Sequence, residues 1–127
     1  MTERSAALWR PSAERIAQSE LTKFSGFVAE RFPEIDVSTY EALHQWSIGS
    51  TTDFWRCIWD YSDVIASHES DDVVRDLDKM PGATWFPDAR LNFAENLLRR
   101  RGDHTAIISL LENGTRSETS FDELYWQ

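Results

Sequence analysis

The segment that decides the fold is ATWFPDARLNFAENLLRRR, residues 83–101. It opens with Trp85–Phe86–Pro87, a stiff aromatic entry, and continues through a short polar turn. Asn92 is a good helix N-cap, and Glu95 stands three residues later, where it can complete a capping box. Asn96 occupies the next position, where a hydrophobic staple would need an apolar residue. The segment therefore predicts a helix whose cap is residue 92.

The predicted helix carries a narrow apolar face. Phe93 and Leu97 fall on one stripe, which we expect to point inward. Arg99–Arg101 would lie in the last turn, where cations complement the helix dipole, and Gly102 would end the helix. These features describe a packing surface without catalytic chemistry of its own, so the helix needs another part of the protein to pack against.

Composition limits the classes of function. A chain of 127 residues suits one modest domain or a piece of a larger protein. Six Trp and seven Phe supply enough apolar surface for a core. The net charge of −9 and the pI near 4.7 argue against binding to nucleic acid or to an anionic membrane, because both need clustered Lys and Arg. With one cysteine, no leader-like start and no run long enough to span a membrane, we expect a cytoplasmic protein.

Helical periodicity dominates the first half of the chain. A first helix is predicted from the cap Ser12 to about Arg31, where Phe32–Pro33 ends it. Residues 18–20 can divide this helix, because Ser19 is a candidate second cap. Apolar residues recur along it at helical spacing, at Ala17, Leu21, Phe24 and Val28.

Two further helices follow. The second is predicted to begin at Ser38, in a capping box with Glu41, and to stop at Gly49. The third begins at residue 50 or 51 and contains Cys57, which we interpret as a small buried hydrophobe rather than a reactive thiol. Aromatic and aliphatic side chains form the face of this third helix, at Phe54 or Trp55, Ile58 and Trp59.

Carboxylates crowd residues 60–78. They lack the alternate spacing, central Gly and terminal Glu of a calcium loop, so we interpret the segment as a solvated, partly extended linker rather than a metal site. Val73–Val74 is a candidate short strand, and residues 79–82 turn the chain into the segment quoted above. The carboxylates are Asp60, Asp63, Glu69, Asp71, Asp72, Asp76 and Asp78.

The periodicity changes after Gly102. Residues 105–111 predict a strand, Asn113–Gly114 is a strong hairpin signal, and residues 116–120 return antiparallel. Ser120 and Glu123 then form a capping box for one more helix. A lone hairpin is marginally stable, so we expect it to belong to a larger fold. The predicted fold class is mainly α, with several short amphipathic helices followed by a β-hairpin that opens a larger α/β domain.

Three segments resemble the N-terminal region of the acyl- and acetyl-CoA synthetases, which are adenylate-forming enzymes. These segments are Leu8–Pro11, Tyr40–Trp59 and Trp85–Leu98. The run Asn96–Leu98 resembles the acetoacetate branch (the acetoacetate–CoA ligases) more than the acetyl branch. The resemblance implies two regions: residues 1–104 as an N-terminal helical region, and residues 105–127 as the first hairpin and helix of the adenylation domain.

The resemblance also implies a function. The full enzyme would be an ATP-dependent short-chain acid–CoA ligase that converts acetoacetate, ATP and CoA to acetoacetyl-CoA, AMP and diphosphate through an acyl-adenylate. Mg²⁺ would offset the phosphate charge. The catalytic motifs would lie in the rest of the ligase chain, so this segment would be structural, inactive alone and without bound ATP, Mg²⁺ or CoA.

Two alternatives stay open beside that function. The chain can instead be the N-terminus of an acetyl- or propionyl-CoA synthetase. It can also be a stand-alone helical module that binds other proteins through exposed Trp and Phe, since Trp and Tyr favour interfaces. Self-association into a homo-oligomer is not decided by the sequence.

No residue is predicted to be catalytic, to bind a cofactor or to bind a metal. Gly49–Asp53 superficially resembles a phosphate loop, but it has one Gly, no nearby Lys and an Asp that would repel phosphate. Arg99–Arg101 could meet a phosphate of CoA, although a helix C-terminus disfavours anions. Asn113–Thr115 matches a glycosylation sequon that the hairpin turn already explains. The histidines lie in different predicted elements, and no nucleophile-elbow spacing links them to Ser and Asp: His44, His68 and His104.

Overall fold

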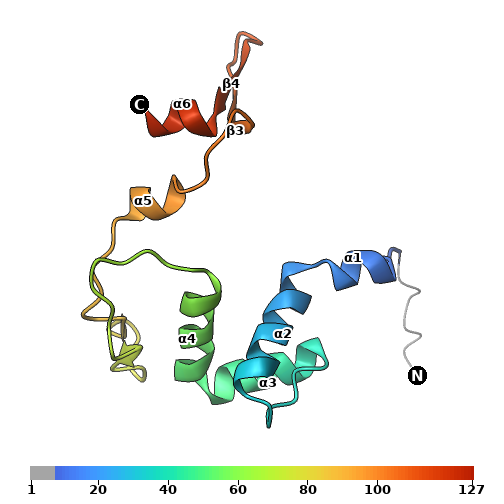
Figure 1. Cartoon of the computed structure of the whole chain (residues 1–127), viewed down its shortest axis with the longest axis vertical. Coiled ribbons are helices and arrows are strands. Elements are labelled where there is room, and N and C mark those ends of the chain that lie inside the picture. Colours follow the sequence, from blue (N-terminus) through green and yellow to red (C-terminus); the bar gives the residue numbers. More distant parts are fainter. Residues whose placement is uncertain (1–7) are drawn as a thin grey trace. The chain divides into compact units, whose positions relative to one another are not determined.

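The computed structural model describes residues 8–127 of the chain. These residues form two compact units that meet between Asp63 and Val64 in the sequence. The N-terminal unit is helical, whereas the C-terminal unit contains two small sheets and two short helices within the described residues. Figure 1 follows the chain from the blue helices of the first unit to the red hairpin and helix of the second.

The N-terminal unit is built on helices, of which the first three have side-chain caps. They are α1 (Ala13–Ala17), α2 (Glu20–Arg31), α3 (Tyr40–Gly49) and α4 (Thr51–Tyr61). The predicted break between the first two is confirmed, because Ser12 accepts from the backbone N–H of Arg15 and Ser19 accepts from that of Thr22, each over 3.2 Å. In Figure 1, α2 and α4 stand side by side, and α3 crosses beneath them.

The cap predicted for α3 was wrong by one residue. Thr39, not Ser38, accepts from the backbone N–H of Ala42, over 3.1 Å. Ser38 instead donates its own N–H to the Asp36 carboxylate over 2.9 Å, and this turn holds Ser38 outside the helix. The helix ends at Gly49 as predicted, and Ser50 precedes α4 without a side-chain cap bond.

One aromatic core holds α2, α3 and α4 together. The Phe54 ring stands edge-on to Phe24 and to Trp46, with centroids 5.9 and 6.0 Å away, a favoured arrangement of aromatic pairs. Leu21 shares the helical spacing of Phe24 and Val28 but is 48% exposed. Cys57 is fully buried, as predicted. The buried members of the core are Phe24, Val28, Leu43, Trp46 and Cys57.

Polar contacts tie both ends of α2 to α4. At the start of α2, the Glu20 carboxylate accepts a hydrogen bond from the Tyr61 hydroxyl over 2.8 Å. At the end of α2, the guanidinium of Arg31 forms an ion pair with Asp60. These contacts fix the relative rotation of the two helices around their apolar contact.

The C-terminal unit alternates short strands and helices. Its elements are β1 (Val74–Arg75), β2 (Thr84–Trp85), α5 (Phe93–Leu97), β3 (Thr105–Leu110), β4 (Arg116–Ser120) and α6 (Phe121–Tyr125). The candidate strand at Val73–Val74 is confirmed in part, since Val74 pairs antiparallel with Trp85. The capping box of α6 is also confirmed, with Ser120 and Glu123 bonded in both directions.

Residues 60–78 are more ordered than the linker that the sequence predicts. Arg75 bonds through Nε to Asp72 over 2.8 Å and through Nη2 to Asp88 over 2.7 Å. Lys79 pairs with Asp76 over 2.9 Å. Two carboxylates of this segment, Asp72 and Asp76, thus have cationic partners nearby in the chain, and the two-stranded sheet of β1 and β2 folds the chain back on itself.

The helix predicted to reach Arg101 is shorter and more exposed than expected. It ends at Leu97, and its C-cap Leu98 donates its N–H to the Ala94 carbonyl over 2.8 Å. Phe93 and Leu97 were predicted to point inward, yet they are 74% and 61% exposed. The apolar face of α5 is therefore uncovered within the C-terminal unit.

Candidate functional site

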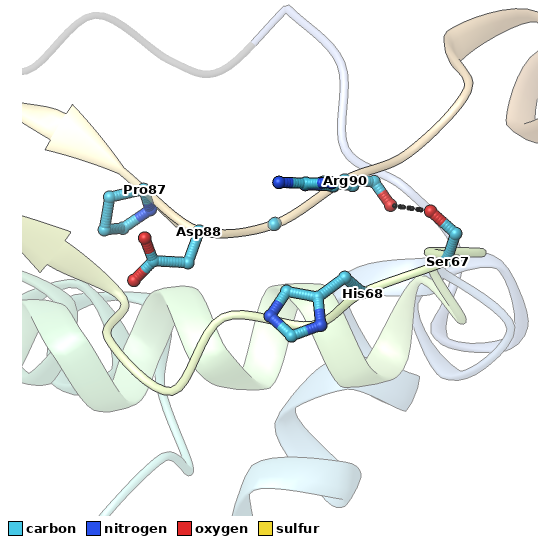
Figure 2. Close-up of a pocket in the computed structure, with 6 residues that line it drawn as sticks. Ser67, His68, Pro87, Asp88 and Arg90 are labelled. Carbon is cyan, nitrogen blue, oxygen red and sulfur yellow. Dashed lines mark hydrogen bonds between the residues drawn. The ribbon is translucent and has the colours of Figure 1, made fainter.

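A hollow of the C-terminal unit lies where two chain segments meet. It has a volume of about 690 Å³ and is open to solvent on one side. Figure 2 shows the two segments, one carrying Ser67 and His68 and the other running from Pro87 to Arg90. Because it gathers a hydroxyl, an imidazole, a carboxylate and a guanidinium, it is the place to test for chemistry.

Backbone bonds between the two segments build this hollow. His68 and Arg90 form an isolated antiparallel bridge. Arg90 donates its N–H to the His68 carbonyl over 2.8 Å, and its own carbonyl accepts the N–H of Ser67 over 2.8 Å. The side-chain hydroxyl of Ser67 donates to the same carbonyl over 3.0 Å. The hydroxyl is thus part of the joint between the segments.

The geometry does not make a nucleophile of Ser67. Figure 2 shows its hydroxyl directed at the Arg90 carbonyl rather than at the His68 ring. A serine nucleophile needs a base within hydrogen-bond reach, and that base needs an orienting group. Asp88 is the carboxylate of the hollow, but it forms an ion pair with Arg75. The Ser, His and Asp side chains are neighbours that do not form a catalytic relay.

A buried serine stiffens the segment beneath the hollow. Ser70 is only 2% exposed. Its hydroxyl donates to the Asp72 carbonyl over 2.7 Å and accepts the N–H of Asp88 over 3.3 Å. A buried hydroxyl that is hydrogen-bonded in both senses adds rigidity rather than reactivity. Ser70 therefore ties the strand β1 side of the hollow to the Pro87–Arg90 side.

The Trp85–Phe86–Pro87 entry sets the direction of the second segment. Phe86 has φ 42°, a left-handed conformation that is costly for a bulky side chain. Its N–H donates to the Val73 carbonyl over 2.7 Å, and its carbonyl accepts from Ala89 over 2.9 Å. Both bonds hold the chain in the sharp turn that leads to Arg90, so the strained residue directly precedes the Pro87–Arg90 segment that lines the hollow.

Asn96 joins α5 to the start of the C-terminal unit, a role that the sequence analysis missed. Its side-chain nitrogen donates to the Ile65 carbonyl and its side-chain oxygen accepts the Ile65 N–H, both over 2.8 Å. The same nitrogen also donates to the Asn92 carbonyl over 3.0 Å. The signal in the sequence was a polar residue at the position where a hydrophobic staple would need an apolar one.

Two of the three arginines after α5 contact α6 instead of completing a helix. The Arg100 guanidinium lies over the Phe121 ring, 5.1 Å from its centroid, and that of Arg101 lies over the Tyr125 ring. Gly102 donates its N–H to the Asp122 carboxylate over 2.9 Å and accepts the Asp122 N–H over 3.1 Å. The prediction that these arginines cap the dipole of their own helix was wrong, because that helix ends first.

The remaining candidate residues have structural surroundings. His44 stacks on Tyr40 with ring centroids 6.1 Å apart, and His104 tilts against Phe121 at 4.8 Å. Gly49–Asp53 forms the junction of α3 and α4. Burial raises the pKa of the Cys57 thiol, which disfavours the reactive thiolate.

The described residues contain neither a metal-binding cluster nor a membrane-spanning helix. Among residues 8–127, no group of three or more His, Cys, Asp or Glu side chains is arranged to hold a metal ion. Within the same range, every helix is too short or too polar to cross a lipid bilayer.

Comparisons with known proteins identify the fold. Residues 40–97 match the family model described as the acetyl-coenzyme A synthetase N-terminus. The chain is 38% identical over 117 residues to acetoacetyl-coenzyme A synthetase of Rhizobium meliloti, an alignment covering 92% of this chain and 18% of that protein. The chain belongs to the acetyl-coenzyme A synthetase N-terminus family. The match runs from α3 to α5, so it includes the hollow, the Ile65–Asn96 link and the strained Phe86.

Two further relatives are similar to nearly the whole chain. Malonamoyl-CoA synthetase of Penicillium aethiopicum is 36% identical over 124 residues, covering 92% of this chain and 17% of that protein. The solved acetoacetyl-CoA synthetase from Streptomyces lividans superposes with a TM-score of 0.82 at 36% identity, covering 94% of this chain and 19% of that one. The chain is homologous to acetoacetyl-CoA synthetases over nearly its whole length, but it spans less than a fifth of theirs.

Proposed function

We propose that this chain is the N-terminal segment of an ATP-dependent acetoacetate–CoA ligase. The full enzyme joins acetoacetate to CoA through an acyl-adenylate and releases AMP and diphosphate, with Mg²⁺ offsetting the phosphate charge. The observation that carries this proposal is the 38% identity to the Rhizobium meliloti acetoacetyl-coenzyme A synthetase over 92% of the chain. The likeness to the solved acetoacetyl-CoA synthetase from Streptomyces lividans, at 36% identity, supports it.

Within that enzyme the segment has a structural role. Residues 1–104 form its N-terminal helical region, and residues 105–127 open the adenylation domain. Support for this division comes from β3, whose successive residues Ile107 and Ile108 face opposite sides of the hairpin and are 42% and 55% exposed. A strand that is apolar on both sides is typical of a buried position in a larger sheet. Its partner is the rest of the same ligase chain.

The chemistry belongs to that remainder. We assign no catalytic, cofactor-binding or metal-binding residue to this segment, because Ser67 bonds to a carbonyl and Arg100 and Arg101 lie over aromatic rings. ATP, Mg²⁺, CoA and acetoacetate are ligands of the full enzyme. A cytoplasmic location fits the single buried cysteine, since secreted proteins commonly rely on disulfides.

A chimaera tests this proposal. The aligned N-terminal part of the Rhizobium meliloti enzyme is replaced by this chain, and acetoacetyl-CoA formation is measured with acetoacetate, ATP and CoA. The chimaera is expected to keep substantial activity, whereas the 127-residue chain alone is expected to form no thioester. A control chimaera with Val28→Ala and Asn96→Ala should lose activity through instability. An inactive but folded chimaera would contradict the proposal, as would turnover by the chain alone.

The acid is the least constrained part of the proposal. One relative is named for malonamoyl-CoA rather than acetoacetyl-CoA at nearly the same identity. Acetate and propionate are therefore tested beside acetoacetate. If the full enzyme prefers acetate or propionate, it is an acetyl- or propionyl-CoA synthetase, and the structural role of this segment is unchanged.

A stand-alone interaction module is the second candidate function. The exposed Trp9, Trp85 and Trp126 favour it, because Trp is enriched at protein interfaces. The reading frame beyond the codon for Gln127 separates the two candidates. Continuation into a Gly/Ser/Thr-rich loop that ends in Lys supports the ligase, whereas a stop codon supports the module.

A further inference from the structure

The loop between β3 and β4 is held by few contacts. Residues 112–114 form its tip, and all of them are exposed. Gly114 donates its N–H to the Leu111 carbonyl, and Leu111 donates its own to the Thr115 carbonyl, each over 2.9 Å. The residues on either side of the tip, from 110 to 116, are exposed as well, so no packed side chain holds the tip closed. Local opening of the tip therefore costs little free energy.

This loop is longer than the two-residue turn that Asn–Gly commonly forms in hairpins. The Gly114–Leu111 bond closes a turn around Glu112 and Asn113, and Gly114 follows with φ +81°. A three-residue loop of this kind needs a residue in the left-handed region, which Gly supplies without strain. The fold thus requires Gly immediately after Asn113.

The side chain of Asn113 is oriented toward the following peptide. Its Oδ1 accepts the N–H of Thr115 over 3.0 Å. The ring closed by this hydrogen bond contains both Cγ of Asn113 and the backbone nitrogen of Gly114. The Thr115 donor also lies where negative charge would develop on Oδ1 if a nucleophile attacked Cγ, and such a donor stabilises that charge. Space around Gly114 is open, with no heavy atom within 4 Å of where a Cβ would stand.

We propose that Asn113 is a site of spontaneous deamidation in the folded protein. When the Gly114 N–H leaves the Leu111 carbonyl, the nitrogen gives its proton to water or hydroxide and attacks Cγ of Asn113. The new N–C bond closes a five-membered succinimide, and the side-chain nitrogen leaves as ammonia. Water then adds to one of the two imide carbonyls and one C–N bond breaks. If the bond to the side-chain carbonyl carbon breaks, the product is aspartate. If the bond to the backbone carbonyl carbon breaks, the product is isoaspartate, whose backbone passes through the former side chain.

The two products differ in their effect on the hairpin. Each changes the formal net charge from −9 to −10, because a neutral amide becomes a carboxylate. Aspartate at position 113 keeps an oxygen that can accept the Thr115 N–H. Isoaspartate inserts one more carbon into the backbone of the loop, so the spacing of the Leu111–Gly114 and Leu111–Thr115 bonds is lost.

The chain contains its own matched controls. Asn92 and Asn96 precede Phe93 and Leu97, whose side chains shield the backbone nitrogen that would attack. The Asn96 amide is also held by Ile65, and Asn92 caps α5 through Oδ1. One sample therefore allows the deamidation rate of Asn113 to be compared with the rates of the two restrained asparagines.

The experiment incubates the 127-residue chain at neutral and mildly alkaline pH and maps its peptides by mass spectrometry, with enzymatic methylation to detect isoaspartate. Conversion at Asn113 is expected to be roughly tenfold or more faster than at Asn92 or Asn96, and to rise with pH. The Asn113→Gln variant should show no conversion, because its ring would be larger. Equal rates at the three asparagines would overturn the proposal. So would conversion that occurs in urea but not in the folded chain, since the loop would then protect Asn113.

Discussion

The side-chain amide of Asn96 pairs with the backbone of Ile65 as one strand pairs with another. The nitrogen donates to the Ile65 carbonyl and the oxygen accepts the Ile65 N–H, both over 2.8 Å. The two residues are 31 positions apart, so one amide closes the loop that contains β1, β2 and the hollow. No other residue type of similar size offers a donor and an acceptor in that arrangement.

The Asn96→Ala variant should loosen this loop. It removes hydrogen bonds whose net contribution is about 1 kcal/mol each, so we expect the C-terminal unit to lose about 1–3 kcal/mol of stability. Hydrogen exchange followed by mass spectrometry should show faster exchange at the Ile65 amide. Asn96→Asp should have an intermediate effect, because it keeps the acceptor and loses the donor. The control Gln45→Ala removes an exposed amide and should leave exchange at Ile65 unchanged; an equal effect of both variants would contradict the assignment.

A substitution in the core of the N-terminal unit should lower the free energy of unfolding more than one on its surface. Val28 on α2 is fully buried, whereas Ile48 on α3 is 59% exposed. Val28→Ala should lower the free energy of unfolding by about 2 kcal/mol, through lost burial and a residual cavity. Ile48→Ala should change it by less than about 0.5 kcal/mol. Urea unfolding followed by circular dichroism measures both, and similar losses for the two variants would show that the aromatic core is not the source of stability.

Local signals in the sequence predicted much of this fold. The caps Ser12, Ser19, Asn92 and Ser120 each bond to a backbone N–H three residues later, so sequence spacing alone contains the interaction. At the start of α3 a local turn, in which Ser38 bonds to Asp36, competes with the predicted cap. The cap is therefore Thr39, one residue later than predicted. The hairpin was also predictable, because strand pattern and turn residues are adjacent in the chain.

Contacts between distant residues were not predictable in the same way. The end of α5 at Leu97 precedes a run whose Arg100 lies over Phe121, 21 positions later. The hollow depends on the His68–Arg90 bridge, for which the sequence contains no periodic signal. The exposed face of α5 is a different case: helical spacing placed Phe93 and Leu97 on one stripe, but spacing alone does not show whether a stripe is covered, and both side chains are exposed.

Because Cys57 is buried, its thiol should react slowly with thiol reagents in the native chain. Its pKa is raised, chiefly because burial disfavours the charged thiolate. A thiol reagent should therefore label the native chain at least roughly 100-fold more slowly than the urea-unfolded chain. The control carries Glu30→Cys at an exposed position in a Cys57→Ala background and should react equally fast in both states. Fast native labelling of Cys57 would contradict its burial.

The same raised pKa gives a pH dependence with a definite sign. The folded chain holds the Cys57 proton more tightly than the unfolded chain does, whose thiol titrates near 9.0. The stability from this group is thus fully present below pH 9.0 and falls as the pH rises through the higher folded value. Urea unfolding of the parent chain and of Cys57→Ala, at pH values below and above 9.0, should show a steeper loss for the parent above 9.0. Parallel pH profiles would contradict the prediction.

The capping box of α6 should weaken in acid. Glu123 accepts the backbone N–H of Ser120 over 2.7 Å and its hydroxyl over 2.9 Å, and these bonds lower the pKa of the carboxyl below its ordinary value of 4.5. Because the folded pKa is depressed, this contribution to stability is present above 4.5 and is lost as the pH falls through the folded value. The Ser120 amide signal in nuclear magnetic resonance should therefore titrate below the ordinary glutamate range. Glu123→Gln, which cannot ionise, should flatten that titration, whereas the exposed Glu112→Gln should not alter it. A Ser120 signal that titrates equally in the parent and in Glu123→Gln would assign the titration to another carboxyl.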